Sequence, residues 1–257
     1  MDNINMTGTV YVIGLGPGRR DLVTPAALAA IERCPVIAGY TKYVAQINDL
    51  LADKKVIKNG MGGEVERCRL ALEEALQGQD VCVVCSGDPG IFAMGGLIYE
   101  LRDLEKRFVD IAIEVVPGLT AVNAAAARLG SPLTNGCAII SLSDLLTPTA
   151  TIIRNLEAIS RSDMACALYN PAGKKRRELL NRAVEIFRQH RGAEIPAAVV
   201  KHASRKDEEK WLGRLGDLPL EMVDMNSLIV IGNSTSVINK GIFYDRRGYA
   251  EKYFKQN

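Results

Sequence analysis

Residues 81–95 read VCVVCSGDPGIFAMG, and this stretch decides the fold. An apolar, β-branched run stops at Ser86, and a GDPG sequence at 87–90 follows before a helical pattern begins. The pattern predicts a buried strand that runs into a tight loop, where an open α/β sheet presents its ligand site. Its glycines let a ligand approach the backbone, and Asp88 offers a short carboxylate. The same residue types also form ordinary turns, so the loop alone leaves a ligand site and a plain connection equally open.

The composition is that of a soluble globular protein. The chain has 257 residues, enough for one large domain or two modest ones. Hydrophobic residues make up 47% and charged residues 24%, which excludes a disordered or fibrous chain. The formal net charge is +2, so no global field favours nucleic acid or an anionic membrane as a partner.

The six cysteines are scattered through predicted strands and helices and form no disulfide framework. Cys82 and Cys85 lie three residues apart along one predicted strand, which puts their side chains on opposite faces. We therefore expect neither a redox pair nor a metal site. The sequence shows no signal peptide and no apolar run long enough to cross a bilayer, so we expect a cytoplasmic protein without a membrane partner.

A second glycine loop follows the first predicted strand. Residues 9–18 read TVYVIGLGPG, and Thr24 before a proline predicts the start of a helix. A dinucleotide-binding fingerprint would place a third glycine where Arg19 stands and an acidic ribose ligand after the second strand. That strand, at 35–38, leads instead into GYTKY at 39–43, which has no carboxylate. Classical NAD binding is therefore not expected.

The pattern divides the chain into two halves. In the first half, further helices are predicted around 44–51 and 65–76 and from Asp88 to about Lys106, with strands at 56–57 and 111–116. In the second half, strands are predicted at 137–142, 164–169, 197–200, 211–212 and 228–231, with helices at 120–129, from 147 and around 180–187. Pro117-Gly118 closes a strand midway along the chain. We therefore predict two α/β domains, 1–117 and 118–257.

The tail and the loops complete this prediction. After Asn233 no long apolar pattern remains, which indicates an arm over the surface or at a subunit interface. Glycine- or proline-rich loops follow strands at 14–18, 87–90, 117–120 and 169–173. If these strand ends converge, the loops form a cleft between the domains for an adenosine-containing cofactor. None of them ends in Gly-Lys-Ser/Thr, so a P-loop kinase or ATPase is not expected.

Five motifs in order resemble the tetrapyrrole methylase family, which uses S-adenosylmethionine. They are GLGPG at 14–18, SGDPGIFAMG at 86–95, VPGLTA at 116–121, LYNP at 168–171 and SLIVIGNS at 227–234. The similarity spans nearly the whole chain. Within the family, the most similar subgroup is the precorrin-3B C17-methyltransferases, including the cobalt-precorrin-3 version of the anaerobic pathway. The stretches that carry this finer similarity are GYTKYV at 39–44, LYNPAGKKR at 168–176 and HASR at 202–205.

The resemblance implies two α/β domains with the cofactor in the cleft between them, commonly within a homodimer. Carried over by position, the residues expected around S-adenosylmethionine are Gly14, Gly16, Pro17, Gly87, Asp88, Ile91, Thr120, Ala121, Leu168, Tyr169, Asn170 and Ser227. From these positions we expect Asp88→Ala to weaken cofactor binding and leave the fold intact.

The implied substrate is a tetrapyrrole with acetate and propionate arms, which needs cationic partners. The substrate-binding candidates are Tyr40, Lys42, Lys174, Arg176 and Arg205. Runs of charge also form solvated faces, and tyrosine rings also pack without a ligand, so these structural alternatives stay open.

The chemistry needs little from the protein in its first step. A sulfonium methyl is already activated, so alignment is sufficient and no strong nucleophile is required. The subgroup also contracts the macrocycle, which needs proton movements. His202, Ser204 and Asn233 are the candidate proton donors or acceptors.

The predicted function is therefore S-adenosylmethionine-dependent methylation of a precorrin at C17, with ring contraction, in cobalamin biosynthesis. Four alternatives stay open. They are another tetrapyrrole methylase, a methyltransferase of the same family acting on ribosomal RNA or diphthamide, an NAD-dependent dehydrogenase, and a noncatalytic tetrapyrrole binder. The near-neutral net charge disfavours RNA.

Overall fold

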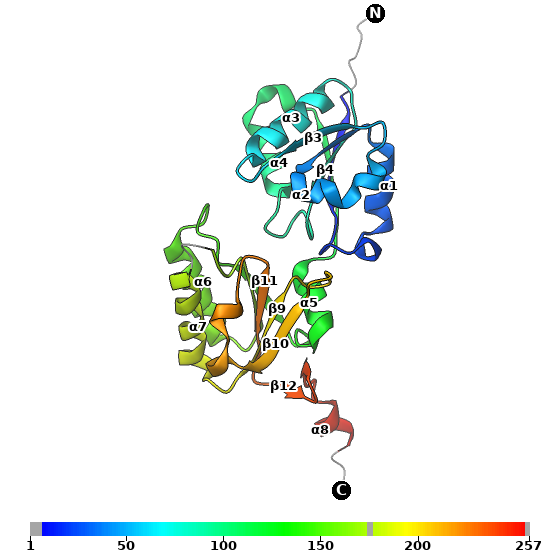
Figure 1. The fold of residues 1–257 in the computed structure, drawn as a ribbon. Coiled ribbons are helices and arrows are strands. Elements are labelled where there is room, and N and C mark those ends of the chain that lie inside the picture. Colours follow the sequence, from blue (N-terminus) through cyan, green and yellow to red (C-terminus); the bar gives the residue numbers. More distant parts are fainter. Residues whose placement is uncertain (1–6, 174–176, 255–257) are drawn as a thin grey trace, which may run out of the picture. The chain divides into compact units, whose positions relative to one another are not determined.

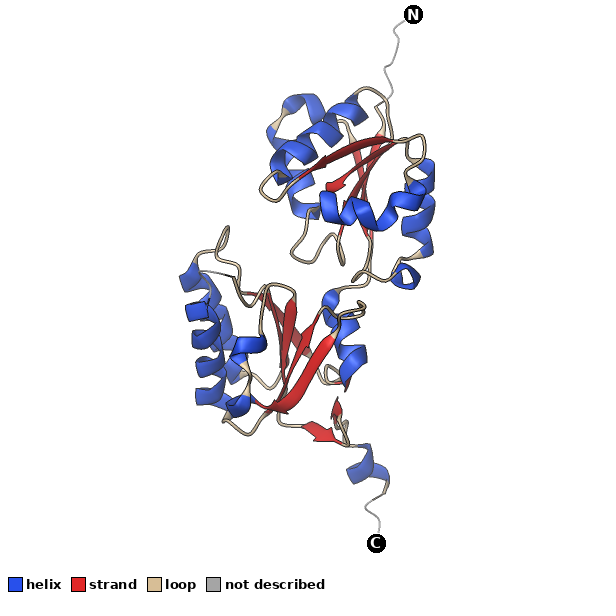
Figure 2. Ribbon diagram, in the orientation of Figure 1, coloured by secondary structure: helices blue, strands red, loops and turns tan. Residues whose placement is uncertain are grey.

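The computed structural model describes residues 7–173 and 177–254 (Figure 1). The chain divides into two compact units, Met1–Ala121 and Val122–Asn257. Each unit has its own five-stranded sheet, with helices packed against both faces (Figure 2). The α/β class predicted from the sequence is confirmed.

The first unit is built on a parallel sheet in the order β3-β2-β4-β1-β5. Its strands are β1 (Thr9–Gly14), β2 (Val36–Tyr40), β3 (Lys55–Asn59), β4 (Val81–Cys85) and β5 (Ala112–Val116). Its helices are α1 (Pro25–Arg33), α2 (Thr41–Val44), α3 (Glu64–Leu76) and α4 (Gly95–Leu104). Short 3₁₀ turns lie at Arg20–Leu22, Ala45–Leu50 and Lys106–Phe108.

The central strand β4 shows why this sheet has helices on both sides. Val81, Val83 and Cys85 pack with α3 and α4. Cys82 and Val84 pack with α1 and α2 on the other face. All five residues are at most 2% exposed, and burying an aliphatic side chain stabilises a fold by about 1.5–3 kcal/mol. The predicted placement of the two cysteines on opposite faces is thus confirmed.

The start of α1 agrees with the sequence prediction, whereas the start of α4 does not. Thr24 caps α1, because its Oγ1 accepts a hydrogen bond of 3.1 Å from the Ala27 amide. The helix expected directly after Asp88 begins only at Gly95. The Asp88 carboxylate binds loop amides, and Phe92 has a left-handed backbone with φ of 52°, so the intervening residues form a loop.

The second unit has a mixed sheet in the order β10-β9-β11-β8-β7. Its strands are β7 (Cys137–Ser141), β8 (Ala165–Tyr169), β9 (Pro196–Lys201), β10 (Glu209–Arg214) and β11 (Ser227–Ile231). Strands β7 and β8 are parallel, whereas β11 runs antiparallel to both β8 and β9. Strand β10 pairs antiparallel with β9 at the edge of the sheet.

Helices cover both faces of this sheet as well. Helices α6 (Thr149–Arg161) and α7 (Arg177–Arg191) pack on one face, and α5 (Ala121–Leu129) packs on the other. The predicted boundary at Pro117 lies in the segment that connects β5 to α5. Within the described residues, every helix is too short or too polar to cross a membrane.

The C-terminal segment differs from the predicted arm. Strands β12 (Ser236–Asn239) and β13 (Ile242–Asp245) form a hairpin, and β13 also pairs with β6 (Gly130–Ser131). A short helix, α8 (Tyr249–Tyr253), follows. Each hairpin strand has only four residues, too few for the pattern to show, yet Phe243 is fully buried against α5.

A half-buried arginine joins three parts of the second unit. Arg191, the last residue of α7, donates to four backbone carbonyls, those of Ile159 at 2.6 Å, Ser160 at 3.1 Å, Ser162 at 2.9 Å and Gly232 at 2.7 Å. Burial lowers the pKa of its guanidinium below the ordinary value. The Arg191 guanidinium therefore links the end of α6 and the segment after β11 to α7.

Replacing Arg191 with methionine should destabilise the protein by about 2 kcal/mol or more, because hydrogen bonds from a charged donor to buried carbonyls are lost together. Urea unfolding would measure this change. Arg188→Met on the same helix is the control, since Arg188 is exposed. Equal stability of both variants would contradict the role of Arg191.

Candidate functional site

The carboxyl ends of β1, β4 and β5 meet at one edge of the first sheet, because these strands are parallel neighbours. The loops that follow them are joined through the backbone. Gly16 and Gly87 exchange two amide-to-carbonyl hydrogen bonds, of 3.1 and 2.7 Å, and the Leu15 amide donates to the Cys85 carbonyl at 2.8 Å. Two of the three predicted loops thus form one short antiparallel bridge.

The third loop joins them through glycines that no other residue can replace. A Cβ atom on Gly14 would lie 2.4 Å from the Gly87 carbonyl oxygen, and one on Gly118 would lie 2.2 Å from the same atom. Real Cβ atoms do not approach a backbone oxygen this closely, so the three loops pack backbone against backbone.

Gly87 itself has an open side. Its φ is 68°, and a Cβ placed on it would meet only the Thr120 Cα, at 4.0 Å. The edge therefore presents bare backbone beside Gly87, with Thr120 next to it. Such a surface suits a ligand that is held through backbone groups, because no side chain keeps the ligand away.

Asp88 fixes this arrangement. Its Oδ1 accepts from the Gly90 amide at 2.8 Å and its Oδ2 accepts from the Gly118 amide at 3.0 Å. Both carboxylate oxygens thus bind loop backbone. The expectation that Asp88→Ala leaves the fold intact is therefore revised, since the side chain connects two of the loops.

The other predicted residues of the first unit lie at or near the same edge. Gly16 and Pro17 are buried, whereas Ile91, Thr120 and Ala121 are half-buried. Tyr40 ends β2, another parallel strand of the sheet, and Lys42 follows it. The rings of Tyr40 and Tyr43 meet edge to face with centroids 5.1 Å apart, and Lys42 is exposed.

In the second unit, strand polarity also gathers predicted residues at one edge. The ends of β7, β8 and β9 and the start of β11 lie together, because β11 runs antiparallel to its neighbours. The residues at this edge are Leu168, Tyr169, Asn170, His202, Ser204, Arg205 and Ser227. Leu168 is fully buried in the core, in a strand paired on both sides.

Side chains hold the loop after β8 in place. The Tyr169 hydroxyl accepts a hydrogen bond of 2.7 Å from the Val122 amide in the first turn of α5. Asn170 has a left-handed backbone with φ of 50°, and its Nδ2 donates to the Ser141 Oγ at 3.0 Å. The Leu142 amide donates to the Tyr169 carbonyl at 2.9 Å. The loops after β7 and β8 are thus bonded to each other.

Ser227 belongs to a turn that the sequence analysis missed. The Ser227 Oγ donates to the Asp224 Oδ1 at 3.1 Å. The Asp224 Oδ1 also accepts a hydrogen bond from the Asn226 amide at 2.8 Å. Burial alone raises the pKa of Asp224, but these hydrogen bonds and the charge of Lys201, 3.4 Å away, outweigh it and lower the pKa. The Asp-x-Asn sequence before a strand is the signal that could have predicted this turn.

One described residue among the predicted candidates, Asn233, is not brought to this edge. Asn233 follows β11 and so lies at the opposite edge, where it is 1% exposed and its Oδ1 accepts from the Thr235 amide at 2.9 Å. It therefore does not join His202 and Ser204 in one group. Lys174 and Arg176 lie outside the described residues.

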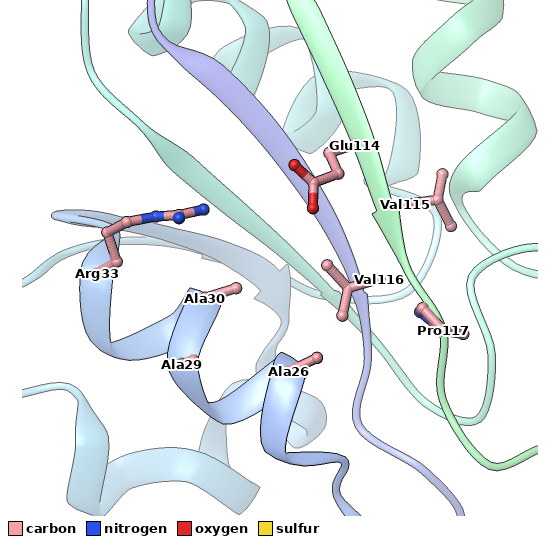
Figure 3. Close-up of a pocket in the computed structure, with 8 residues that line it drawn as sticks. All are labelled: Ala26, Ala29, Ala30, Arg33, Glu114, Val115, Val116 and Pro117. Carbon is pink, nitrogen blue, oxygen red and sulfur yellow. The ribbon is translucent and has the colours of Figure 1, made fainter.

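A hollow in the first unit is a competing candidate, and Figure 3 shows the residues that line it. It has a volume of about 230 Å³ and lies between α1 and the edge strand β5. None of the predicted site residues lines it, and its volume is below the 300–1,000 Å³ or so of usual ligand pockets. Among the described residues no cluster of histidine, cysteine or acidic side chains could hold a metal.

Comparisons with known proteins give a consistent result. Residues 9–219 match one family model, described as tetrapyrrole (corrin/porphyrin) methylases. A probable cobalt-factor III C(17)-methyltransferase from Salmonella typhimurium is 42% identical over 93% of this chain and 98% of its own length. A precorrin-3B C(17)-methyltransferase from a Sinorhizobium species is 34% identical over 95% of this chain and 98% of its own.

A solved structure is similar over the same extent. The crystal structure of the methyltransferase CobJ matches with a TM-score of 0.89 at 34% identity, and the match covers 93% of this chain and 100% of the other.

Asp88→Asn should destabilise the protein by about 1–3 kcal/mol, because it removes the charge that two loop amides bind. Asp103→Asn should change stability by less, since Asp103 is exposed and its ion pair with Arg102 lies on the surface. Urea unfolding measures both variants. An unchanged stability of Asp88→Asn would contradict the role of Asp88 in joining the loops.

Asp224→Asn should reduce the stability of the protein at neutral pH and change how that stability depends on pH. The native carboxyl has a lowered pKa, so its contribution is present above its ordinary pKa of about 4 and is lost as pH falls through the lower native value. The stability difference from wild type should therefore shrink below about pH 4. Denaturant unfolding at several pH values tests this, with the exposed Asp217→Asn as the control.

Proposed function

Because the chain belongs to the tetrapyrrole (corrin/porphyrin) methylases, we propose that it methylates a tetrapyrrole at C17 with S-adenosylmethionine, in cobalamin biosynthesis, and contracts the macrocycle. The observation that carries this proposal is the match to C17-methyltransferases along almost their whole length. The resemblance of the motifs at 39–44 and 202–205 to the same subgroup agrees with it.

The methyl donor would bind against the exposed backbone at the sheet edge of the first unit. When bound, S-adenosylmethionine supplies a methyl group that is already activated by its sulfonium centre. Gly87 presents open backbone, and Ile91, Thr120 and Ala121 stand at the same edge as the residues that would hold the donor. Asp88 keeps this edge in shape by binding the loops on both sides of it.

The second unit carries the other side chains that the family resemblance assigns to the cofactor. Tyr169, Asn170 and Ser227 lie at one edge of its sheet, and each is held by hydrogen bonds within the unit. Fixed groups of this kind orient a bound reactant without moving, and orientation is the main requirement for transfer of an activated methyl group.

The substrate would be recognised through its acidic rim. Lys42 and Arg205 are exposed cations at the two sheet edges, and carboxylate arms favour such partners. A relative named for cobalt-factor III is 42% identical, and a relative named for precorrin-3B is 34% identical, which favours a cobalt-containing substrate. The homodimer implied by the family resemblance stays a prediction, which light scattering would test.

Incubation with S-adenosylmethionine and cobalt-factor III should give a product heavier by one methyl group, attached at C17. A methyl label followed by carbon NMR locates the new carbon, and a label on the bridging ring carbon reports contraction. Methylation at another carbon would contradict the C17 assignment and keep the family activity.

Matched controls separate the alternatives. Metal-free precorrin-3B in place of the cobalt complex tests the preference for cobalt, and ribosomes in place of tetrapyrrole test the RNA alternative. Calorimetric titration should show binding of S-adenosylmethionine and no binding of NAD. Binding of NAD alone would favour a dehydrogenase, and tetrapyrrole binding without methyl transfer would favour a noncatalytic binder.

A further inference from the structure

The loop after β9 holds two non-glycine residues in a backbone conformation that favours glycine. His202 has φ of 51° and Ser204 has φ of 64°. For residues with a Cβ this region is strained, and strain of this kind persists where the side chain is needed. Asn170, in the neighbouring loop after β8, has the same feature, so strained residues gather at this edge of the second unit.

Hydrogen bonds hold the strained loop. Glu208 accepts from the Ser204 amide at 2.6 Å through Oε2 and from Arg128 Nε at 2.7 Å through Oε1. The Glu208 side chain is only 13% exposed, and Arg128 belongs to α5. At the start of the loop, the His202 amide donates to the Asn226 carbonyl at 3.1 Å. The loop is thus fixed to α5 and to the turn before β11.

The imidazole of His202 lies beside an acidic side chain. Its side chain is 18% exposed, and its Nδ1 lies 2.5 Å from the Asp207 Oδ2. The Nδ1 atom is buried, and it makes no hydrogen bond to any described residue. The Asp207 side chain is 66% exposed. A carboxylate beside Nδ1 leaves Nε2 as the nitrogen that exchanges protons with a ligand.

We propose that His202 exchanges the proton that ring contraction requires, and that Asp207 and Glu208 are its positioning residues. This inference rests on the proposed function. In the step, one bond between hydrogen and the substrate breaks, its electron pair stays on the substrate, and the proton forms a new bond to Nε2. No oxidant or reductant takes part. Asp207 orients the ring, and Glu208 holds the backbone that carries it.

His202→Gly separates catalysis from structure. Glycine favours the left-handed backbone, so the thermal unfolding temperature should equal or exceed that of wild type. The kcat for contracted product should fall about 100-fold or more, with KM for the tetrapyrrole unchanged, because a positioned proton acceptor is lost. Added imidazole should restore part of kcat. A histidine with only a structural role would lower stability on removal and give no rescue.

Two further sets of variants test the positioning residues. Asp207→Asn should lower kcat by less than His202→Gly does, and Asp207→Glu, which keeps the carboxylate, should retain more activity than Asp207→Asn. Asp53→Gly is the matched control, since Asp53 has φ of 62° in an exposed turn of the first unit and should change stability without changing turnover.

The outcomes distinguish the two proposals. Wild-type protein that transfers no methyl group to either tetrapyrrole would overturn the proposed function, and this inference with it. Active wild type with an equally active His202→Gly would overturn the inference alone. If His202→Gly does not fold, Asp207→Asn provides the test. Wild-type turnover in Asp207→Asn would overturn the proposed roles of His202 and Asp207.

Discussion

The contact of three glycines at one sheet edge is the constraint on which the first unit depends. Gly14, Gly87 and Gly118 come from three different strand ends, yet their backbones approach more closely than any side chain allows. Asp88 adds a carboxylate to this contact by binding the Gly118 amide. The edge is therefore a rigid surface made of main chain, and its shape follows from the order of the parallel strands.

In the second unit, side chains hold the loops at the sheet edge. The Tyr169 hydroxyl, the Asn170 amide and the Glu208 carboxylate each hold a loop at the edge of its sheet. Such groups carry charge and hydrogen-bonding capacity that glycines lack. The first unit thus presents main-chain groups at its sheet edge, and the second unit presents polar side chains at its own.

The sequence predicted local features well because they depend on neighbouring residues. The alternation along β4, the cap at Thr24 and the loops after strands follow from patterns of a few residues. The role of Asp88 could not be predicted, since Gly118 is 30 positions away and their contact depends on the strand order. Asn233 was grouped with His202 because sequence does not reveal strand direction, and β11 runs antiparallel to β9. Asp207 beside His202 became visible only once the loop conformation was known.

The pairing of β13 with β6 has a consequence for the order in which the chain folds. Every contact within the first unit joins residues up to Ala121, so its core is complete once that part of the chain has been synthesised. In the second unit, Phe243 fills the core over α5 and pairs through its strand with Gly130. Helix α5 also packs on β8, β9 and β11, but the part of its apolar face that Phe243 covers stays exposed until β13 has been synthesised. A chain that stops short of β13 leaves that face open to aggregation.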